Sequence, residues 1–592
     1  MRNRFVCFLI TTLVASLPLD SYAGSFKTRT RAEADAIRIR IKAARFLDAA
    51  TFGATKAEID VLAQRMGEIN HKAAMAEWID RQFALQPTLI EPTAIQMISD
   101  DGLTLTQGDA GVARYRHQAF WHLALSADDQ LRHRTAFALS QIVVINDHMF
   151  GGRTPDLSGK PNYLAPLNYY DMLVQNSSRT YRDILFDATL HPCMGRFLSH
   201  RRNRKADEAG TRFPDENFAR EIMQLFSIGL YELKPNGTYQ RDEDGNLIPT
   251  YTNEEIKAFS RVFTGLTDVP NEFWGLGNSF VPMVMWEREH DTGEKQLLNG
   301  TVIPADQPGM QDINDAIDNI ASHRNIGPFI GRRLIQRLTK SNPSKGYLSR
   351  VSTVFRESGG DMKSVIKAIL LDKEFLAAVT FKMIKNGPGD WTLKVIDKGT
   401  KGSKFREPML RYTSFLRKFK VETTNQNGWF MMGDMRWQWT QAFMDSPSVF
   451  NFYLPDFQPP GEIVSYRAPK SVPNRFLAAP EFELYTSVTA NRTPNRFRRD
   501  IFNEQSEHNL FSNSTYTFTS TLPLNFAEEK TLAADPQALV DHLDVLLAHG
   551  NLTNKIRREL VAALTEETTD ATERTHAAIL SVMIAPETAV TR

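Results

Sequence analysis

Apolar residues recur at helical spacing along most of this chain, and this pattern constrains the fold more than any other feature. Residues 131–145 are nearly all apolar, which predicts a helix buried on most sides. Further helical patterns cover 169–174, 181–190, 252–266, 313–322, 328–338, 347–355 and 362–375. Thr252, with Glu255 three residues later, predicts a capping box at the start of 252–266. The clearest strand signal is a hairpin over 237–251 that turns at Asp244-Gly245. The sequence therefore predicts a mainly α fold, a large multi-helix domain with a small β-hairpin.

Two long stretches, 267–307 and 427–480, have no helical period. Long irregular segments in compact proteins are usually either functional or disordered. Because both stretches are rich in aromatic residues, we expect two long ordered insertions. The polar residues 483–525 predict a linker or insertion, and helical patterns return over 526–592. We therefore expect a main helical domain over 24–482 and a separate C-terminal helical region.

The first 23 residues have the layout of a cleaved secretory signal peptide. Arg2 and Arg4 precede an apolar run over 5–17, and the small-residue exit Ser21-Tyr22-Ala23 follows. The alternative is a buried N-terminal helix. No later stretch approaches the roughly 18 uninterrupted apolar residues of a membrane helix, so we expect no stable membrane insertion. The predicted location is the periplasm or the medium, after cleavage near Ala23.

Charge and cysteine content follow from that cleavage. The chain has 70 Lys and Arg against 69 Asp and Glu, and removal of Arg2, Arg4 and Asp20 leaves 68 of each. A balanced chain has no global field that attracts nucleic acid, so we expect no nucleic-acid partner. Cleavage also removes Cys7 and leaves Cys193 as the one thiol. The mature protein is therefore expected to have no internal disulfide.

Seven segments carry a family resemblance when they are taken in order. They are RFLDAATFG (45–53), RTAFALSQ (134–141), DENFAREIMQLFSIG (215–229), PTYTNEEIKAFSRVFTG (249–265), EHDTGEKQLLNG (289–300), GPFIGRRLIQRL (327–338) and SPSVFNFYLPDFQPPG (446–461). Over about residues 42–482 the chain resembles the bacterial domain-of-unknown-function family 1800. The resemblance implies an exported, mostly helical protein, often found beside a second exported family that resembles sulfatases and alkaline phosphatases. It implies no settled activity.

Glu221 is the first candidate catalytic residue. The segment 215–229 predicts a helix with a core-facing stripe of Phe218, Ile222, Leu225 and Phe226. Glu221 lies at the margin of that stripe, where loss of solvent raises the pKa of a carboxyl group and suits it to acid or base catalysis. Arg220 adjoins it, and Asn217 and Gln224 are candidate binding residues. The alternative is structural, with Glu221 and Asn217 bonded to the backbone amides of a neighbouring loop.

A second candidate group lies in the irregular stretch 267–307. His290 and Asp291 stand beside two glutamates, and Lys295 follows, so proton transfer or ligand binding is possible there. Adjacent side chains rarely converge on one ion, and we predict no metal site. The alternative is a network that only fixes the loop. Arg204 and Lys205 belong to a basic run at 201–205 that could bind sulfate, phosphate or carboxylate, or could simply be a solvated face.

Nine of the 29 residues over 429–457 are aromatic. Such side chains can stack on sugar rings, but they also supply buried area, and we favour the core here. Together these features favour an enzyme that acts on an envelope or extracellular anionic polysaccharide by general acid/base chemistry. The alternative is a non-catalytic binding or assembly partner of a second exported protein. Cofactor, substrate and reaction are not readable from the sequence, which has none of the common nucleotide, zinc or serine-hydrolase motifs.

Overall fold

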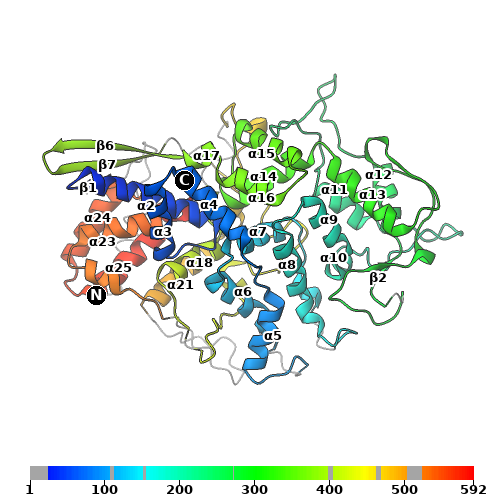
Figure 1. The fold of residues 1–592 in the computed structure, drawn as a ribbon, viewed down its shortest axis with the longest axis horizontal. Helices are drawn as coiled ribbons and strands as arrows, with labels where there is room; N and C mark the ends of the chain where they lie inside the picture. Colours follow the sequence, from blue (N-terminus) through cyan, green and yellow to red (C-terminus); the bar gives the residue numbers. More distant parts are fainter. Residues whose placement is uncertain are drawn as a thin grey trace.

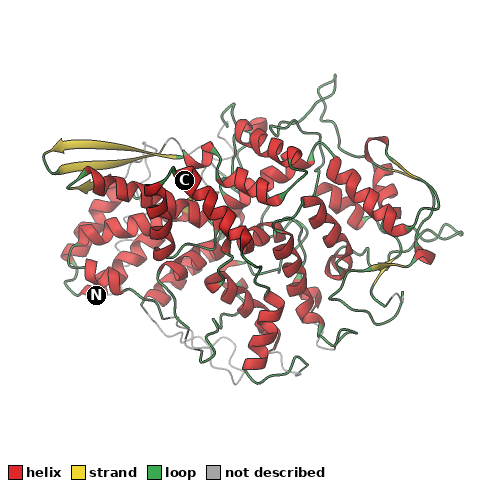
Figure 2. Cartoon of the chain, in the orientation of Figure 1, coloured by secondary structure: helices red, strands yellow, loops and turns green. Residues whose placement is uncertain are grey.

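The computed structural model describes residues 25–591 apart from 107–111, 151–154, 271–272, 398–403, 424, 462–467 and 503–522. The predicted signal peptide lies outside the described residues. Helices make up most of the structure, and the strands are few and short, as Figures 1 and 2 show. The predicted mainly α fold is confirmed. No described helix combines the length and apolar character needed to cross a bilayer.

The N-terminal helices begin with a long helix that is capped at its start. Thr30 accepts a hydrogen bond from the Glu33 amide, and Glu33 accepts one in return from the Thr30 amide, so both ends of this capping box are satisfied. Every residue of α7, the sixth helix of the group, is buried, as predicted for 131–145. The helix ends at Ser140, five residues before the predicted end. The group comprises α2 (Arg31–Ala50), α3 (Lys56–Glu68), α4 (His71–Ala84), α5 (Ile90–Asp100), α6 (Tyr115–Ser126) and α7 (Gln130–Ser140).

The central helices follow the predicted patterns closely. The predicted capping box of Thr252 and Glu255 opens α12. Within the predicted hairpin over 237–251, Arg241 bridges to Leu247, whereas Tyr239 and Pro249 bridge to Leu233 and Tyr231, which precede the predicted segment. The group comprises α8 (Ala165–Asn176), α9 (Tyr181–Leu190), α10 (Pro192–Phe197), α11 (Asn217–Gln224), α12 (Asn253–Val262), α13 (Gly309–Ser322), α14 (Ile326–Leu338), α15 (Lys345–Glu357), α16 (Met362–Leu370) and α17 (Lys373–Leu376).

One three-stranded antiparallel sheet adds to the predicted fold. Its order is β1 (Ser25–Thr28), β7 (Asp390–Asp397) and β6 (Val379–Gly387), and β1 begins two residues after the predicted cleavage site. The side chains of Phe26 on β1 and Leu393 on β7 are fully buried. Figure 1 shows the β6–β7 hairpin extending from the helical body. Four shorter strands, β2 (Leu266–Thr267), β3 (Val284–Met285), β4 (Lys295–Gln296) and β5 (Val302–Ile303), pair within the first irregular stretch.

The C-terminal helices pack beside the N-terminal ones, as Figure 1 shows for α23–α25 and α2. The predicted linker begins with a helix, α21, in which Phe497 and Ile501 are buried. A single cluster of buried apolar residues runs from Ala43 to Ala585. The group comprises β8 (Lys404–Phe405), α18 (Pro408–Lys418), α19 (Arg436–Trp439), α21 (Ser487–Ile501), α22 (Ala527–Leu532), α23 (Pro536–Leu543), α24 (Asn554–Glu566), α25 (Ala571–Ile584), α26 (Pro586–Ala589) and β9 (Val590–Thr591).

A buried ionic cluster ties these regions together around Asp48 on α2. Lys418 Nζ lies 2.6 and 2.8 Å from the two Asp48 carboxylate oxygens. Arg406 lies 3.3 Å and His549 lies 3.0 Å from Asp48 Oδ2. All four residues are buried. Three distant parts of the chain therefore meet at one carboxylate.

Cys193 on α10 is a free, fully buried thiol, and burial raises its pKa far above the ordinary value. A thiol in that state is a poor nucleophile. We expect the mature protein to react with a thiol reagent only after unfolding, and to have the same thermal midpoint with and without reductant. A midpoint that falls on reduction would reveal a disulfide and contradict this account.

Candidate functional site

The structure places Glu221 at the edge of the core, as its helical position predicts. Phe218, Ile222 and Phe226 are buried in the predicted stripe, and Leu225 is half-buried. The Glu221 side chain is buried, and its Oε2 has no hydrogen-bond partner among the described residues. Burial raises the pKa of Glu221, and the charge of Arg220 partly opposes that shift.

The other predicted residues on α11 do not close around Glu221. Arg220 lies 3.4 Å from Glu216 in an exposed ion pair. Asn217 is exposed, and Gln224 is half-buried. Burial raises the pKa of the nearby Tyr251 hydroxyl to about 12. The charges of Arg220 and Glu221 both act on this hydroxyl, in opposite directions. Glu221 is thus a buried carboxyl group with few polar neighbours.

His290 is enclosed completely. Its Nδ1 lies 2.9 Å from the Thr264 carbonyl oxygen, and its Nε2 lies 3.0 Å from Asp312 Oδ2. Lys295 Nζ donates to the same Asp312 oxygen at 2.7 Å. Burial alone would raise the pKa of Asp312, but the hydrogen bonds from His290 and Lys295 hold it below its ordinary value. Asp312, which was not a predicted site residue, is therefore the centre of this cluster.

The remaining predicted residues pair with partners from other segments. Asp291 binds the Arg261 guanidinium with distances of 2.8 and 2.9 Å. Arg204 binds Glu289 in the same two-point manner, at 2.8 and 2.9 Å, and the Lys205 amide donates to the Glu289 carbonyl oxygen at 3.0 Å.

The structure thus brings Arg204, Lys205, His290, Asp291 and Lys295 around one loop, where their polar groups bind protein partners. No described hydrogen bond or ion pair joins Glu221 to that loop. For the group around His290, this geometry agrees with the alternative interpretation, in which a network of polar contacts only fixes the loop. A catalytic role for Glu221, Arg220, His290 and Asp291 stays a prediction.

A different cluster, which the sequence did not suggest, contains two buried carboxyl groups in contact. Asp147 follows α7, and Asp445 follows α19 and precedes the segment 446–461. The Asp147 amide donates to the Met444 carbonyl oxygen at 2.9 Å, and the Asn146 side chain donates to the Ser446 carbonyl oxygen at 2.8 Å. These two bonds hold both loops side by side.

The two carboxyl groups lie close enough for the charge of one to act on the other. Their ligand oxygens lie within 4.8 Å of one another. Asp147 Oδ1 is buried and has no hydrogen-bond partner among the described residues. Burial, with the charge of Asp147 adding to it, raises the pKa of Asp445 to about 7. Asp445 therefore keeps its proton to a higher pH than an ordinary aspartate does.

Basic side chains surround this carboxyl pair. Arg116 Nη1 lies 3.1 Å from Asp147 Oδ2. Arg436 contacts both Asp445 and His148, and His148 Nε2 lies 3.2 Å from Asp445 Oδ1. The His148 side chain is 58% exposed, whereas those of Asp147 and Asp445 are 3% and 4% exposed. The pair therefore lies just beneath a surface that His148 and Arg436 form.

Backbone strain and exposed aromatic residues mark the same place. Met444, directly before Asp445, has φ 55°, a left-handed conformation that is costly for a residue with a side chain and that often occurs at functional sites. Trp437 is 70% exposed and Phe450 is 47% exposed, each within a few residues of the cluster along the chain. The buried Trp439 and Phe443 show that much of the aromatic stretch 429–457 does belong to the core.

The ligand atoms of Asp147, His148 and Asp445 lie within 4.8 Å of one another, which is close enough to surround a metal ion. However, Arg116 and Arg436 already contact one oxygen of each carboxyl group. Two guanidinium ions in those positions repel a divalent cation. A carboxyl group with a raised pKa beside a second carboxyl group suits acid/base chemistry, which is what this arrangement can do.

The comparisons with known proteins give one match. The family model described as "Protein of unknown function (DUF1800)" matches residues 45–590, which is nearly the whole chain. The chain belongs to this family. No curated protein and no solved structure matches it. Membership of DUF1800 confirms the resemblance of the seven segments and extends it to the C-terminal helices, but it assigns no activity.

Two of the DUF1800 segments adjoin the carboxyl pair in the sequence. Asp147 lies six residues after 134–141, and Asp445 is directly before 446–461. The signal that could have located the site is an acidic residue beside each of two specific segments. Because about 300 residues separate them, local spacing did not indicate that they meet.

Proposed function

We propose that the protein is an exported enzyme that cleaves an anionic envelope or extracellular polysaccharide by general acid/base catalysis at Asp147 and Asp445. The observation that carries this proposal is the buried pair of carboxyl groups, of which Asp445 has a raised pKa, beside an exposed histidine. The ligand oxygens of the two carboxyl groups lie within 4.8 Å of one another, which fits the short spacing of a two-step, retaining mechanism. Asp445 donates its proton to the departing glycosidic oxygen while the Asp147 carboxylate bonds to the sugar carbon. Water then hydrolyses this ester and returns a proton to Asp445, so the pair ends as it began.

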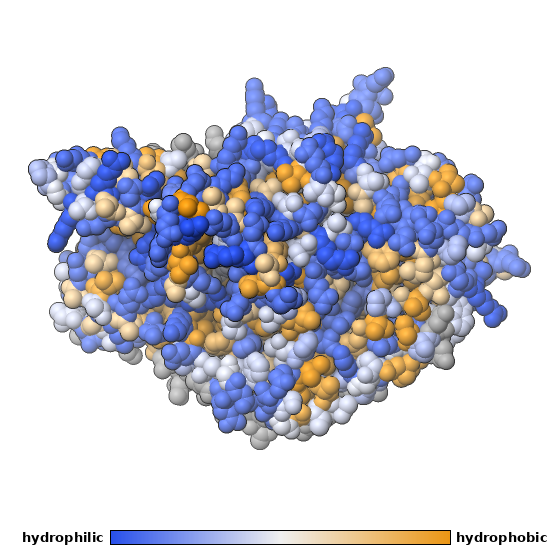
Figure 3. Space-filling view, viewed as in Figure 1, coloured by the Kyte–Doolittle hydropathy of each residue, from blue (hydrophilic) through white to orange (hydrophobic). Residues whose placement is uncertain are grey.

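Positive charge and exposed aromatic side chains near the cluster support an anionic sugar as substrate. Arg116 and Arg436 supply positive charge beside the pair, and guanidinium groups bind sulfate and carboxylate well. The exposed Trp437 and Phe450 offer faces on which sugar rings stack. A non-catalytic partner role would favour a broad apolar surface. On the face in Figure 3, hydrophobic residues form small separate groups among hydrophilic ones.

Export rests on the signal-peptide pattern over 1–23. We expect the protein recovered from the exported fraction of its host to begin at Gly24, one residue before β1. N-terminal sequencing measures this directly. Exported protein that retains Met1 would contradict the proposed processing.

The activity itself is tested with a panel of sulfated, uronic and neutral polysaccharides. Purified residues 24–592 are incubated with each polymer, and new reducing ends and unsaturated sugar products are both measured. We expect cleavage of a sulfated or uronic polymer and none of the neutral ones. Binding of a polymer without any cleavage would favour the non-catalytic alternative, in which the protein assists a second exported protein.

Glu221 is the competing candidate, and Glu221→Gln separates the two sites. The pKa of Glu221 is raised in the folded state, so its ionisation costs stability, and that cost grows as pH rises through the ordinary pKa range of glutamate. Glu221→Gln is therefore expected to leave the free energy of unfolding at pH 7 unchanged or higher by about 1 kcal/mol. With Asp445 as the acid, turnover should stay near that of the wild type. A loss of about 100-fold in a folded variant would move the catalytic site to Glu221.

A further inference from the structure

A basic pocket lies apart from both candidate sites, where α2, the start of α4, α17 and β6 meet. It has a volume of about 470 Å³, and it is lined by the basic side chains of Arg38, Lys42, Lys72 and Lys373. No lining residue is acidic. Lys72 and Lys373 are exposed, so the pocket is open to solvent.

The positive charge of this pocket is only partly neutralised. Asp35 pairs with Arg38 at 2.7 Å. The acidic residues nearest to the pocket along α17 are already occupied, Asp372 by Arg350 at 2.7 Å and Glu374 by Lys340 at 2.6 Å. The structure describes no ion pair for Lys42, Lys72 or Lys373.

Mutual repulsion among these cations is visible at Lys42. Burial lowers the pKa of Lys42, and the charges of Arg38 and Arg45 lower it further. The pKa of His71 is lowered in the same way, by burial and then by Lys42 and Arg38. Cations held together at this density with few counter-charges favour the binding of an anion.

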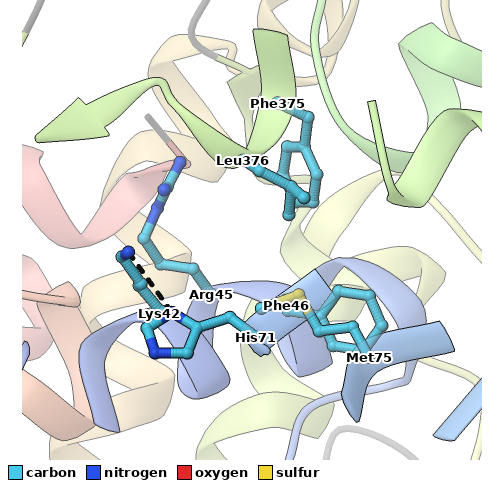
Figure 4. Close-up of a pocket in the computed structure, with 7 residues that line it drawn as sticks. All are labelled: Lys42, Arg45, Phe46, His71, Met75, Phe375 and Leu376. Atoms are coloured by element: carbon cyan, nitrogen blue, oxygen red, sulfur yellow. Dashed lines mark hydrogen bonds between the residues drawn. The ribbon is translucent and has the colours of Figure 1, made fainter. Parts of the chain in front are cut away.

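A smaller hollow adjoins the pocket and gives it an apolar floor. Figure 4 shows Lys42 and His71 turned toward each other at its edge, with a distance of 3.5 Å between Lys42 Nζ and His71 Nδ1. Phe46, Met75, Phe375 and Leu376 supply its apolar lining, and Arg45 lines it as well. His71 is the first residue of α4, and the positive end of that helix dipole adds to the attraction for an anion.

We infer that this basic pocket binds an oxyanion, which is a sulfate, phosphate or carboxylate group, either free or attached to a sugar. Four cationic side chains from three segments converge on one hollow large enough for a small ligand. Lys42, at the junction of the two hollows, is the residue best placed to hold the anion. The inference stands independently of the proposed cleavage activity.

The test is a titration of residues 24–592 with sodium sulfate, sodium phosphate and sodium acetate at constant ionic strength, followed by calorimetry and by the thermal midpoint. We expect saturable binding of at least one anion, weakened about tenfold or more in Lys42→Gln and in the more exposed Lys72→Gln. The matched control is Lys382→Gln on β6, which removes the same charge outside the pocket. Its affinity should equal that of the wild type.

Sulfated and uronic oligosaccharides form a second arm that separates a free anion from one attached to a sugar. Tighter binding of an oligosaccharide than of its free anion identifies the sugar-borne group. The inference would be overturned if the thermal midpoint rose in proportion to the concentration of added anion, without saturation. The rise would then be equal in the wild type, Lys42→Gln, Lys72→Gln and Lys382→Gln. Asp445→Asn should bind the anion normally, so failure of this site and failure of the proposed activity are distinguishable.

Discussion

Replacement of Asp48 by Ala is expected to lower the free energy of unfolding by about 3–5 kcal/mol, the usual cost of leaving a buried charge unpaired. Asp48 binds Lys418 at 2.6 and 2.8 Å and lies 3.0 Å from His549, all in the solvent-excluded core. Without the carboxylate, the Lys418 ammonium has no counter-charge. Denaturant unfolding followed by circular dichroism measures the change.

The matched control is Asp60→Ala, which removes an aspartate that is 56% exposed and 2.8 Å from Arg40. Exposed ion pairs contribute little, so this variant should change the free energy of unfolding by about 1 kcal/mol or less. Equal small effects of the two substitutions would show that the Asp48 cluster does not hold the three regions together.

Asp48 also predicts how stability depends on pH. Burial would raise its pKa, but Lys418, Arg406 and His549 hold the pKa of Asp48 well below the ordinary value. A carboxyl group with a lowered pKa stabilises the folded state above its unfolded pKa, and that stabilisation is lost as pH falls below about 4. In Asp48→Ala this part of the acid sensitivity should disappear.

Asp445→Asn is expected to reduce turnover of the cleaved polysaccharide by about 100-fold or more, the scale on which a positioned proton-transfer group acts. Asparagine keeps the shape of the side chain but carries no acidic proton. Asp147→Asn should have a similar effect. Because the two carboxyl groups serve one step, the double variant should lose little more activity than either single variant.

The control for these variants is Asp390→Asn, at the exposed start of β7, which should turn over substrate at the wild-type rate. Thermal midpoints of all variants are measured in parallel, so that loss of folding is not counted as loss of catalysis. Wild-type turnover by a folded Asp445→Asn protein would remove the pair from the mechanism.

Much of the helical fold could be predicted from the sequence, because helix signals are local. The capping box of Thr252 and Glu255 and the apolar stripe of Phe218, Ile222 and Phe226 both appear as expected. The β6–β7 hairpin was missed although its strands alternate in polarity on both sides of the turn residues 386–389, which is a local strand signal. Its third strand, β1, comes from more than 350 residues away.

The candidate site was less predictable because its residues come from distant parts of the chain. The charged run around His290 was predicted to be a candidate site because its members are adjacent in sequence. Yet His290 binds Asp312 and Asp291 binds Arg261, so each group is satisfied by a partner from another element. Asp147 and Asp445 looked unremarkable in isolation. The pKa of Asp445 is raised only because tertiary packing buries it beside a distant carboxyl group.

The raised pKa of Asp445 is the most direct test of the account. Infrared spectroscopy of the protein with isotope-labelled aspartate detects protonated carboxyl groups, and the signal is followed as pH rises. Burial also raises the pKa of Asp171 to about 8 and that of Asp544 to about 7, so the signal of Asp445 is the difference between the wild type and Asp445→Asn. We expect that difference to persist above ~pH 5, where ordinary aspartates are ionised, and to be lost as pH passes about 7, the raised pKa of Asp445. Identical signals from the two proteins between ~pH 5 and ~pH 7 would contradict the account.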